Sequence, residues 1–88
     1  MNSETTPDFW KEYAKLDSSL KRSARKAFLL WRDNPFHPSL RFKCVNSKQN
    51  VWSLRISKSH RALCTVIDDT AVWFWIGGHD GYEKNYKG

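Results

Sequence analysis

The sequence predicts an α+β fold, in which an N-terminal helical hairpin packs on one face of a mainly antiparallel, twisted sheet. Two observations predict it: apolar side chains recur at helical spacing in the first third of the chain, and after Pro38 they alternate with polar ones or form short runs. With 88 residues, we expect one domain, residues 1–88, and no second core. Five Trp, three Tyr and five Phe supply the large apolar surfaces that so small a core needs.

The first helix is predicted at Pro7–Leu16. Thr6 is a good N-cap, and Pro7 suits the first helical position because its missing N–H would have no partner there. The apolar stripe of this helix consists of Phe9, Trp10, Tyr13 and Leu16. The preceding residues, Met1–Thr6, are polar and include no β-branched aliphatic residue, so we expect them to be mobile.

A second helix is predicted at Ser18–Asp33. Asp17 can cap it, and Pro35 ends it because the residue before a proline avoids helical dihedrals. Its apolar stripe consists of Leu20, Ala24, Ala27, Phe28 and Trp31. The two helices form an αα-hairpin.

Four strands are predicted after the hairpin. Apolar and polar residues alternate in Leu40–Cys44 and in Trp52–Ile56, which predicts strands with one covered face. Arg61–Ile67 and Thr70–Gly77 are nearly continuous apolar runs, as expected of central strands covered on both faces. Turns are expected at 46–50 and 68–69, and Asp80–Tyr86 is expected to be a short tail. The expected core includes Trp10, Phe28, Trp31, Trp52, Leu54 and Ile56.

The charge pattern points to an anionic partner. The net charge is +6 and the pI about 9.6, and residues 34–67 hold six Lys or Arg but no Asp or Glu. A polyanion is therefore the first partner to consider. The same cations would equally suit the solvated face of a half-covered sheet, and composition does not separate these two explanations.

Signals for a membrane or a metal are missing from the sequence. No basic segment followed by an apolar one opens the chain, and the longest nearly uncharged run, Ala71–His79, is too short to span a bilayer. We expect a cytoplasmic protein in which Cys44 and Cys64 are reduced and act as small buried hydrophobes. No metal or other cofactor is expected, because no zinc spacing is formed by His37, His60, Cys64 and His79.

Strand register places two arginines together. If the apolar residues of Trp52–Ile56 face the helices, Arg55 must face the other way. A three-residue turn at 58–60 would pair Ser57 with Arg61 and put Arg61 on the same face. A slip by one residue would instead bury an unpaired guanidinium, which is strongly unfavourable. The other cations expected on this face are Arg41 and Lys43.

His79 and Tyr82 follow the last strand, where the Gly77-Gly78 pair lets the backbone turn them towards the arginines. Cationic groups beside an acid/base pair suit the cleavage of RNA phosphodiesters without a metal. Two plainer explanations stay open. An isolated histidine is more often a turn residue satisfied by backbone, and Tyr82 could cover the core with its hydroxyl in water.

Three sequence motifs resemble a known family. W-S-x-R-I stands at 52–56, H-R-x-L at 60–63 and H-x-x-Y at 79–82. Together with the order of helices and strands, they resemble the RelE/ParE superfamily of bacterial toxin–antitoxin modules. The chain looks most like the RelE/YoeB/HigB branch of messenger-RNA interferases, and the resemblance covers residues 6–82.

The resemblance implies a RelE-like fold and a toxin that cleaves messenger RNA in the ribosomal A site and is neutralised by a cognate antitoxin. It implies that Arg61 stabilises the phosphate, that Arg55 is a second cationic position, and that His79 and Tyr82 form the C-terminal acid/base group. Neither a membrane nor a small-molecule substrate is expected. Further residues expected to bind RNA are Arg41, Lys43 and Lys58.

The sequence departs from the family pattern in two places. The strand that usually precedes the helices is barely visible in Met1–Thr6, and the central strands offer no glutamate as general base, which leaves His79. Two other functions therefore stay open. One is a ParE-like inhibitor of DNA gyrase, which has no use for a His/Tyr acid–base pair. The other is a non-catalytic member of the fold that binds RNA or its antitoxin.

Overall fold

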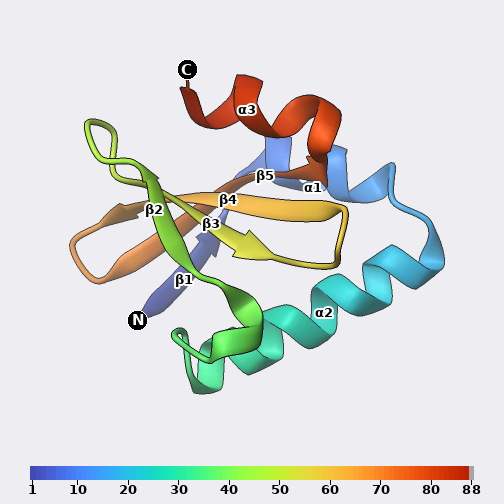
Figure 1. The fold of residues 1–88 in the computed structure, drawn as a ribbon, viewed down its shortest axis with the longest axis horizontal. Coiled ribbons are helices and arrows are strands. Elements are labelled where there is room, and N and C mark those ends of the chain that lie inside the picture. The colour runs from blue at the N-terminus through green and yellow to red at the C-terminus, as the bar shows by residue number, and fades with distance from the viewer. Residues whose placement is uncertain (88) are drawn as a thin grey trace.

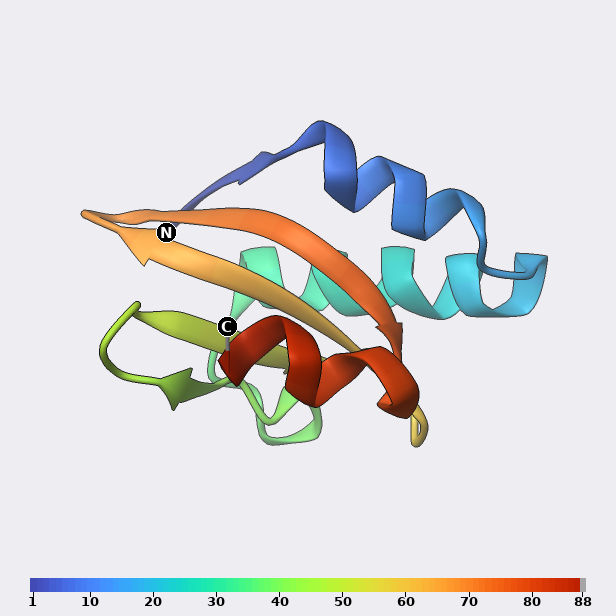
Figure 2. The same cartoon turned by 90° about the horizontal axis from the view of Figure 1, so that it is seen from above.

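The computed structural model describes residues 1–87, so the last residue of the predicted 1–88 domain lies outside it. Within this range a five-stranded sheet has the strand order β1-β5-β4-β3-β2. Helices α1 (Pro7–Ala14) and α2 (Ser18–Asp33) lie on one face of the sheet, and helix α3 (His79–Lys87) covers the other (Figures 1 and 2). The predicted α+β fold class is confirmed, with a third helix added.

Side-chain caps start the two helices of the hairpin. The Thr6 hydroxyl accepts a hydrogen bond from the Phe9 N–H at 3.2 Å, and Asp17 accepts one from the Leu20 N–H at 2.8 Å. Helix α2 has the predicted bounds. Helix α1 is two residues shorter than predicted, because its last turn tightens to an i→i+3 bond between the Lys15 N–H and the Glu12 carbonyl.

The main core lies between the hairpin and the sheet. Trp31 and Trp73 are each 1% exposed and meet edge to face, with ring centroids 5.4 Å apart. Of the six predicted core residues, Trp31, Leu54 and Ile56 are buried, while Phe28 and Trp52 are half-buried at the edge of the core.

Trp10 was predicted to be in the core, and this is wrong, since 52% of its side chain is exposed. Successive helical residues point about 100° apart, and in α1 the inward direction belongs to Phe9. The Trp10 ring packs on the edge of Phe9, with centroids 5.1 Å apart, and its Nε1 donates to the Thr5 hydroxyl at 2.9 Å.

The expectation that residues 1–6 are mobile is also wrong. Strand β1 (Asn2–Thr5) runs parallel to β5 (Thr70–Gly78) at the edge of the sheet. All four of its residues are exposed, so hydrophobic patterning carries no sign of it. Backbone pairing and a bond of 3.0 Å from the Trp73 Nε1 to the Ser3 hydroxyl fix it.

The strand predicted at Leu40–Cys44 starts later than expected. A 3-10 turn, η1 (Pro38–Leu40), precedes β2 (Lys43–Asn46), and Arg41 between them has a left-handed backbone with φ 46°. Pro38 supplies the fixed φ that suits the start of the turn. Strand β2 therefore contributes only four residues to the edge of the sheet.

The central hairpin keeps the predicted faces with a different register. Strand β3 (Val51–Arg55) pairs with β4 (His60–Ile67) so that Arg55 lies opposite Arg61, whereas the prediction paired Ser57 with Arg61. The turn is longer than the three residues expected. Because the error is two residues, the side-chain alternation is unchanged and both arginines still share one face.

The predicted tail at Asp80–Tyr86 is instead part of helix α3. An irregularity in the pairing of β4 with β5 shifts the register between Leu63 and Cys64 and turns Trp75 towards α3. Val51, Leu63 and Trp75 form a second, smaller core under this helix, with Tyr82 and Tyr86 packed against it. Both faces of the central strands are covered, as predicted.

The two thiols lie in different environments. Cys44 and Cys64 are free thiols, and both lie opposite Trp52, one on each side of β3. Two strand spacings, together about 10 Å, therefore separate them. That distance is too long for a disulfide. Cys64 is buried as predicted, but Cys44 is exposed because β2 is an edge strand. Among the described residues, no helix is both long and apolar enough to traverse a bilayer.

Candidate functional site

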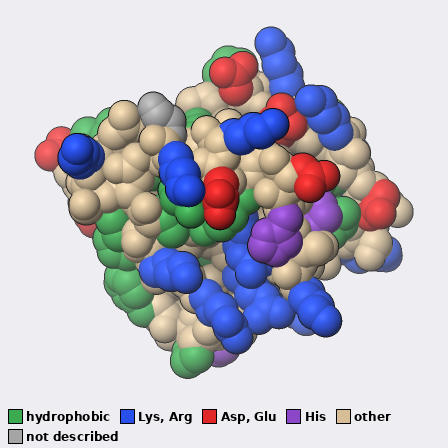
Figure 3. Space-filling view, turned by 45° about the horizontal axis from the view of Figure 1, so that its top comes forward, with side chains coloured by type: hydrophobic (Ala, Val, Ile, Leu, Met, Phe, Trp, Pro, Cys, Tyr) green, Lys and Arg blue, Asp and Glu red, His purple; other side chains and the backbone are tan. Residues whose placement is uncertain are grey.

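Strand pairing sets two rows of side chains on the face that α3 covers. One row consists of Lys43, Ser53, Leu63 and Trp75, and the next of Arg55, Arg61 and Gly77. Directly opposite residues in such rows have Cβ atoms about 5 Å apart, so Arg55 and Arg61 are neighbours. Figure 3 shows Lys and Arg side chains in a band beside His side chains near α3.

Arg61 is held by the turn that precedes it. One terminal nitrogen of its guanidinium donates to the Ser57 carbonyl at 2.6 Å and to the His60 carbonyl at 2.8 Å. Burial lowers the pKa of Arg61, and the charges of Arg55 and Arg41 lower it further, whereas Tyr82 opposes the change. An arginine stays protonated nonetheless. The guanidinium of Arg61 is thus held in place and partly desolvated, and it carries a positive charge and further N–H donors.

Helix α3 brings the tyrosine of the H-x-x-Y motif to this cationic face. The Tyr82 hydroxyl donates to the buried Ser53 hydroxyl at 2.9 Å. His79, the first residue of α3, is exposed, and its ring centroid is 6.4 Å from that of Tyr82 at a steep angle. The strand-to-helix junction puts His79 at the same end of the sheet as Arg61, since Gly77 lies opposite Arg61.

Close approach of α3 to the sheet depends on glycine. A Cβ on Gly81 would lie 2.8 Å from the Cζ2 atom of Trp75, and a Cβ on Gly77 would lie 2.7 Å from the same atom. Both distances are shorter than carbon atoms tolerate. The indole of Trp75 therefore lies flush against the backbone of α3, and this contact sets the height of the helix above the arginines.

We expect Gly81→Ala to destabilise the protein, although glycine-to-alanine changes within helices usually stabilise by about 1 kcal/mol. The added methyl meets the rigid Trp75 ring, and overpacking of this kind costs about 1–3 kcal/mol. Denaturant unfolding monitored by tryptophan fluorescence measures the change. Lys84→Ala, at an exposed position of the same helix, is the control and should stay within about 0.5 kcal/mol of wild type. A stabilised Gly81→Ala protein would contradict this packing.

The structure brings most of the predicted site residues to one face. Arg41 lies close enough to lower the pKa of Arg61, and Lys43 extends from the row beside Ser53. Lys58 lies apart, exposed in the turn between β3 and β4. In residues 1–87 no three His, Cys, Asp or Glu side chains gather as metal ligands would.

Two features of the site were not found from the sequence. Ser53 was predicted to share the face of Arg55 but not to take part in the site, and its contact with Tyr82 depends on α3, which was predicted to be a tail. The three-residue spacing of His79 and Tyr82 was the available signal, because it places both side chains on one face of a helix.

Comparisons with known proteins identify the family and the fold of this chain. A family model described as the ParE-like toxin domain matches residues 18–84, well over half of the chain. No curated protein matches the sequence significantly.

Solved structures share the fold at low identity. RelE in the RelB-RelE antitoxin-toxin complex from Methanococcus jannaschii superposes with a TM-score of 0.75 at 11% identity, over 94% of this chain and 98% of that one. The YoeB/ParE toxin from Agrobacterium tumefaciens gives 0.70 at 18% identity, over 90% and 99%. YafQ from E. coli gives 0.71 at 13% identity, over 92% and 96%. The family-model match and the shared fold confirm the resemblance to the RelE/ParE superfamily, and the chain belongs to the ParE-like toxin domain family of this superfamily.

Proposed function

We propose that this chain is the toxin of a toxin–antitoxin module and acts as an endoribonuclease on messenger RNA in the ribosomal A site. The adjacent Arg55 and Arg61 carry the proposal, because they form a cationic pair, with Arg61 held by its turn, beside the helix that bears His79 and Tyr82. Such a site matches the charge of a phosphodiester in RNA.

The reaction proposed is an internal transesterification. The 2′-hydroxyl of the RNA attacks the adjacent phosphorus and loses its proton, while the bond to the 5′-oxygen breaks and that oxygen gains a proton. The products are a 2′,3′-cyclic phosphate and a 5′-hydroxyl. Negative charge builds on the phosphoryl oxygens in the transition state, where Arg61 and Arg55 would stabilise it. Because Arg61 is already held by the turn, little reorganisation would be needed.

His79 is the residue proposed for proton transfer. The described strands β2 to β5 contain no Asp or Glu, so no carboxylate extends from them into the site. Histidine is the side chain that most often serves as a general acid or base, and His79 is exposed at the start of α3. Tyr82, whose hydroxyl donates to Ser53, would orient the neighbouring imidazole or stack on a splayed base.

Purified ribosomes programmed with a defined message test this function. We expect the wild-type chain to cut the message in the A site and to leave 2′,3′-cyclic phosphate and 5′-hydroxyl ends. Cleavage that leaves a 3′-hydroxyl and a 5′-phosphate would contradict the proposed chemistry. Intact messages together with inhibited DNA gyrase would favour a gyrase inhibitor, and intact messages with active gyrase would favour a non-catalytic binding protein.

The antitoxin is proposed to bind the outer side of the helical hairpin. RelE from M. jannaschii and YoeB from Staphylococcus aureus have been solved in complex with their antitoxins. In this chain a groove of about 660 Å³ lies between β1, α1 and α2 and is lined mainly by aromatic and aliphatic side chains. Trp10 and Leu29 are more than half exposed there, and Arg25 and Arg32 also line it. An acidic amphipathic segment would match both its apolar floor and its charge.

We expect Leu29→Asp to weaken antitoxin binding by about tenfold or more, because it puts a carboxylate into the apolar groove facing an acidic partner. Leu29 is 61% exposed, so the fold should tolerate the change. Lys26→Asp, at an exposed position of α2 outside the lining of this groove, is the control. Isothermal titration with the antitoxin measures both. Equal losses in the two variants would show a general effect of charge and contradict the groove.

A further inference from the structure

Ser53 combines deep burial with a polar contact to the site. Its side chain is 1% exposed on β3, and its hydroxyl accepts the proton of the Tyr82 hydroxyl at 2.9 Å. Among the described residues, the other buried side chains are apolar. Burying a hydroxyl is unfavourable unless it forms a hydrogen bond, so a serine at this place depends on its partner.

Strand alternation links Ser53 directly to the arginines. It lies two residues before Arg55 on the same face of β3, and across the sheet it lies between Lys43 and Leu63. Its partner Tyr82 is close enough to Arg61 to affect the pKa of that guanidinium. The bond between Ser53 and Tyr82 therefore joins the arginine-bearing face of the sheet to α3.

Besides the packing of Tyr82 and Tyr86 against the second core, few contacts constrain the position of helix α3. None of its side chains is fully buried. At its C-terminal end, the Asn46 amide donates to the Tyr86 carbonyl at 2.7 Å. Near its N-terminal end, the glycine contacts with Trp75 set its height, whereas the Tyr82–Ser53 bond fixes its rotation. His79 precedes Tyr82 by about one helical turn, so the same bond sets where the imidazole lies.

We propose that Ser53 is a positioning residue of the site, which holds the Tyr82 hydroxyl and thereby the first turn of α3 so that His79 faces the phosphate bound at Arg61. This inference rests on the proposed cleavage of RNA. In this proposal Tyr82 orients its neighbours and does not transfer a proton, because its hydroxyl already donates a hydrogen bond to Ser53.

A purely structural role for Ser53 makes a different prediction. Alanine has nearly the volume of serine and carries no hydroxyl to desolvate. If only packing between Lys43 and Leu63 mattered, Ser53→Ala would be neutral or stabilising, and each folded molecule would keep its full rate. If the hydroxyl positions α3, the variant keeps its fold and binds RNA normally but loses rate in the chemical step.

The experiment is a double-mutant cycle of Ser53→Ala and Tyr82→Phe in the ribosome cleavage assay. We expect each single variant to lower kcat by about 10- to 100-fold, with KM within about threefold of wild type, because a misplaced group costs rate more than binding. The double variant should be no slower than the slower single variant, since both changes remove one bond. Ser53→Thr, which restores a hydroxyl, should recover most of the rate.

Ser3→Ala is the matched control. It removes a bond of 3.0 Å between a serine hydroxyl and an aromatic donor, Trp73, on the opposite side of the sheet. Its kcat should stay within about twofold of wild type even if the lost hydrogen bond lowers its stability. A wild-type kcat for Ser53→Ala, or additive losses in the double variant, would overturn the proposal.

Amide hydrogen exchange separates this inference from the proposed function. We expect Ser53→Ala and Tyr82→Phe to speed exchange of the hydrogen-bonded amides of α3 by about tenfold, and Ser3→Ala to leave it unchanged. A wild-type chain that cuts no RNA would refute the proposed function. The exchange rates would then test the role of the Ser53 contact without any activity measurement. Unchanged exchange in both variants would refute the positioning role by itself.

Discussion

Arg61→Ala is expected to lower the rate of RNA cleavage by about 10²–10³, the usual loss when one preorganised donor to a transition state is removed. Arg61 offers fixed charge to the phosphoryl oxygens, and its neighbour Arg55 cannot reproduce the geometry that the turn imposes on Arg61. His79→Ala should cost a comparable or smaller factor, because a water molecule can partly replace a proton carrier.

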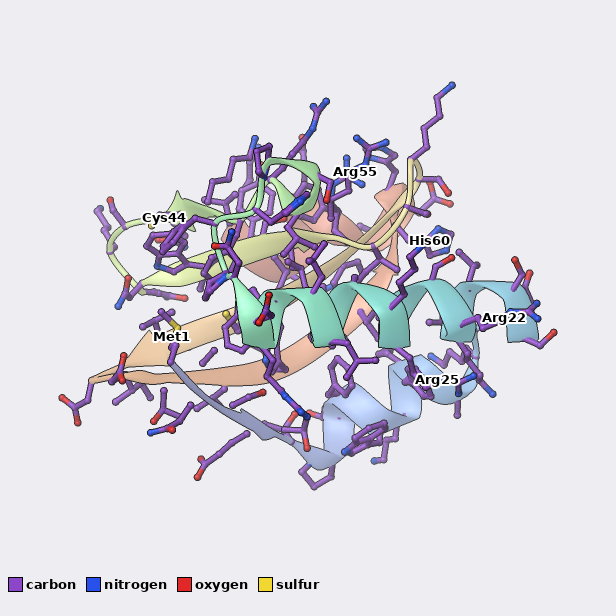
Figure 4. All side chains as sticks on the ribbon, turned by 90° about the horizontal axis from the view of Figure 1, so that it is seen from below. Met1, Arg22, Arg25, Cys44, Arg55 and His60 are labelled. Carbon is purple, nitrogen blue, oxygen red and sulfur yellow. The ribbon has the colours of Figure 1, made fainter. Side chains whose placement is uncertain are left out.

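The Arg61 measurement needs a control for charge and one for stability. Arg22→Ala removes the same charge from α2, where Figure 4 shows Arg22 and Arg25 extending away from Arg55, and it should leave the rate unchanged. Because Arg61 also donates to the Ser57 and His60 carbonyls, its loss will loosen the turn, so rates are to be compared well below the melting temperature of each variant. Equal activity of wild type, Arg61→Ala and His79→Ala would refute the catalytic assignment.

A second large effect is expected in alkaline solution, where the protein should lose up to about 4 kcal/mol of stability between pH 9 and pH 12. Burial raises the pKa of the Cys64 thiol from 9.0 to about 12. The unfolded chain releases this proton near pH 9 and the folded chain does not, so the free energy of unfolding falls as pH rises, by about 1.4 kcal/mol per unit. Below pH 9 both states hold the proton and Cys64 contributes no pH dependence.

Urea unfolding at a series of pH values measures this effect. Lysine and tyrosine also titrate in this range, so the relevant quantity is the difference in slope between wild type and Cys64→Ala. In Cys64→Ala the free energy of unfolding should fall less steeply at alkaline pH, because the contribution of Cys64 is missing. Cys44→Ala, which removes the exposed thiol, should show the same fall as wild type. Parallel curves for wild type and Cys64→Ala would contradict the raised pKa.

Much of the fold could be read from the chain because its signals are local. The caps at Thr6 and Asp17 are satisfied by backbone groups three residues away, so the start of each helix is a property of a few neighbouring residues. The shared face of Arg55 and Arg61 also followed from the sequence. Side chains alternate between the two faces of a strand, and a register shifted by one residue would have buried an unpaired guanidinium, which is strongly unfavourable.

Elements without a hydrophobic pattern were decided by the tertiary structure. Strand β1 buries no side chain and exists because its backbone completes hydrogen bonds with β5. Helix α3 has no fully buried residue, and its position depends on Gly81 meeting Trp75, a ring that a register shift in β5 turns to this face. Neither contact can be inferred from residues close in sequence.

The sequence by itself determined which chemical groups the protein has and which faces of its strands carry them. These groups are two arginines on one side of a hairpin, followed by a histidine and a tyrosine. Only the tertiary structure decided how these groups meet. Ser53 and Tyr82 are 29 residues apart, and their bond forms because α3 folds back over the sheet. Contacts between distant residues depend on the packing of whole elements, and a one-dimensional pattern records the faces of those elements but not the height and rotation at which they dock.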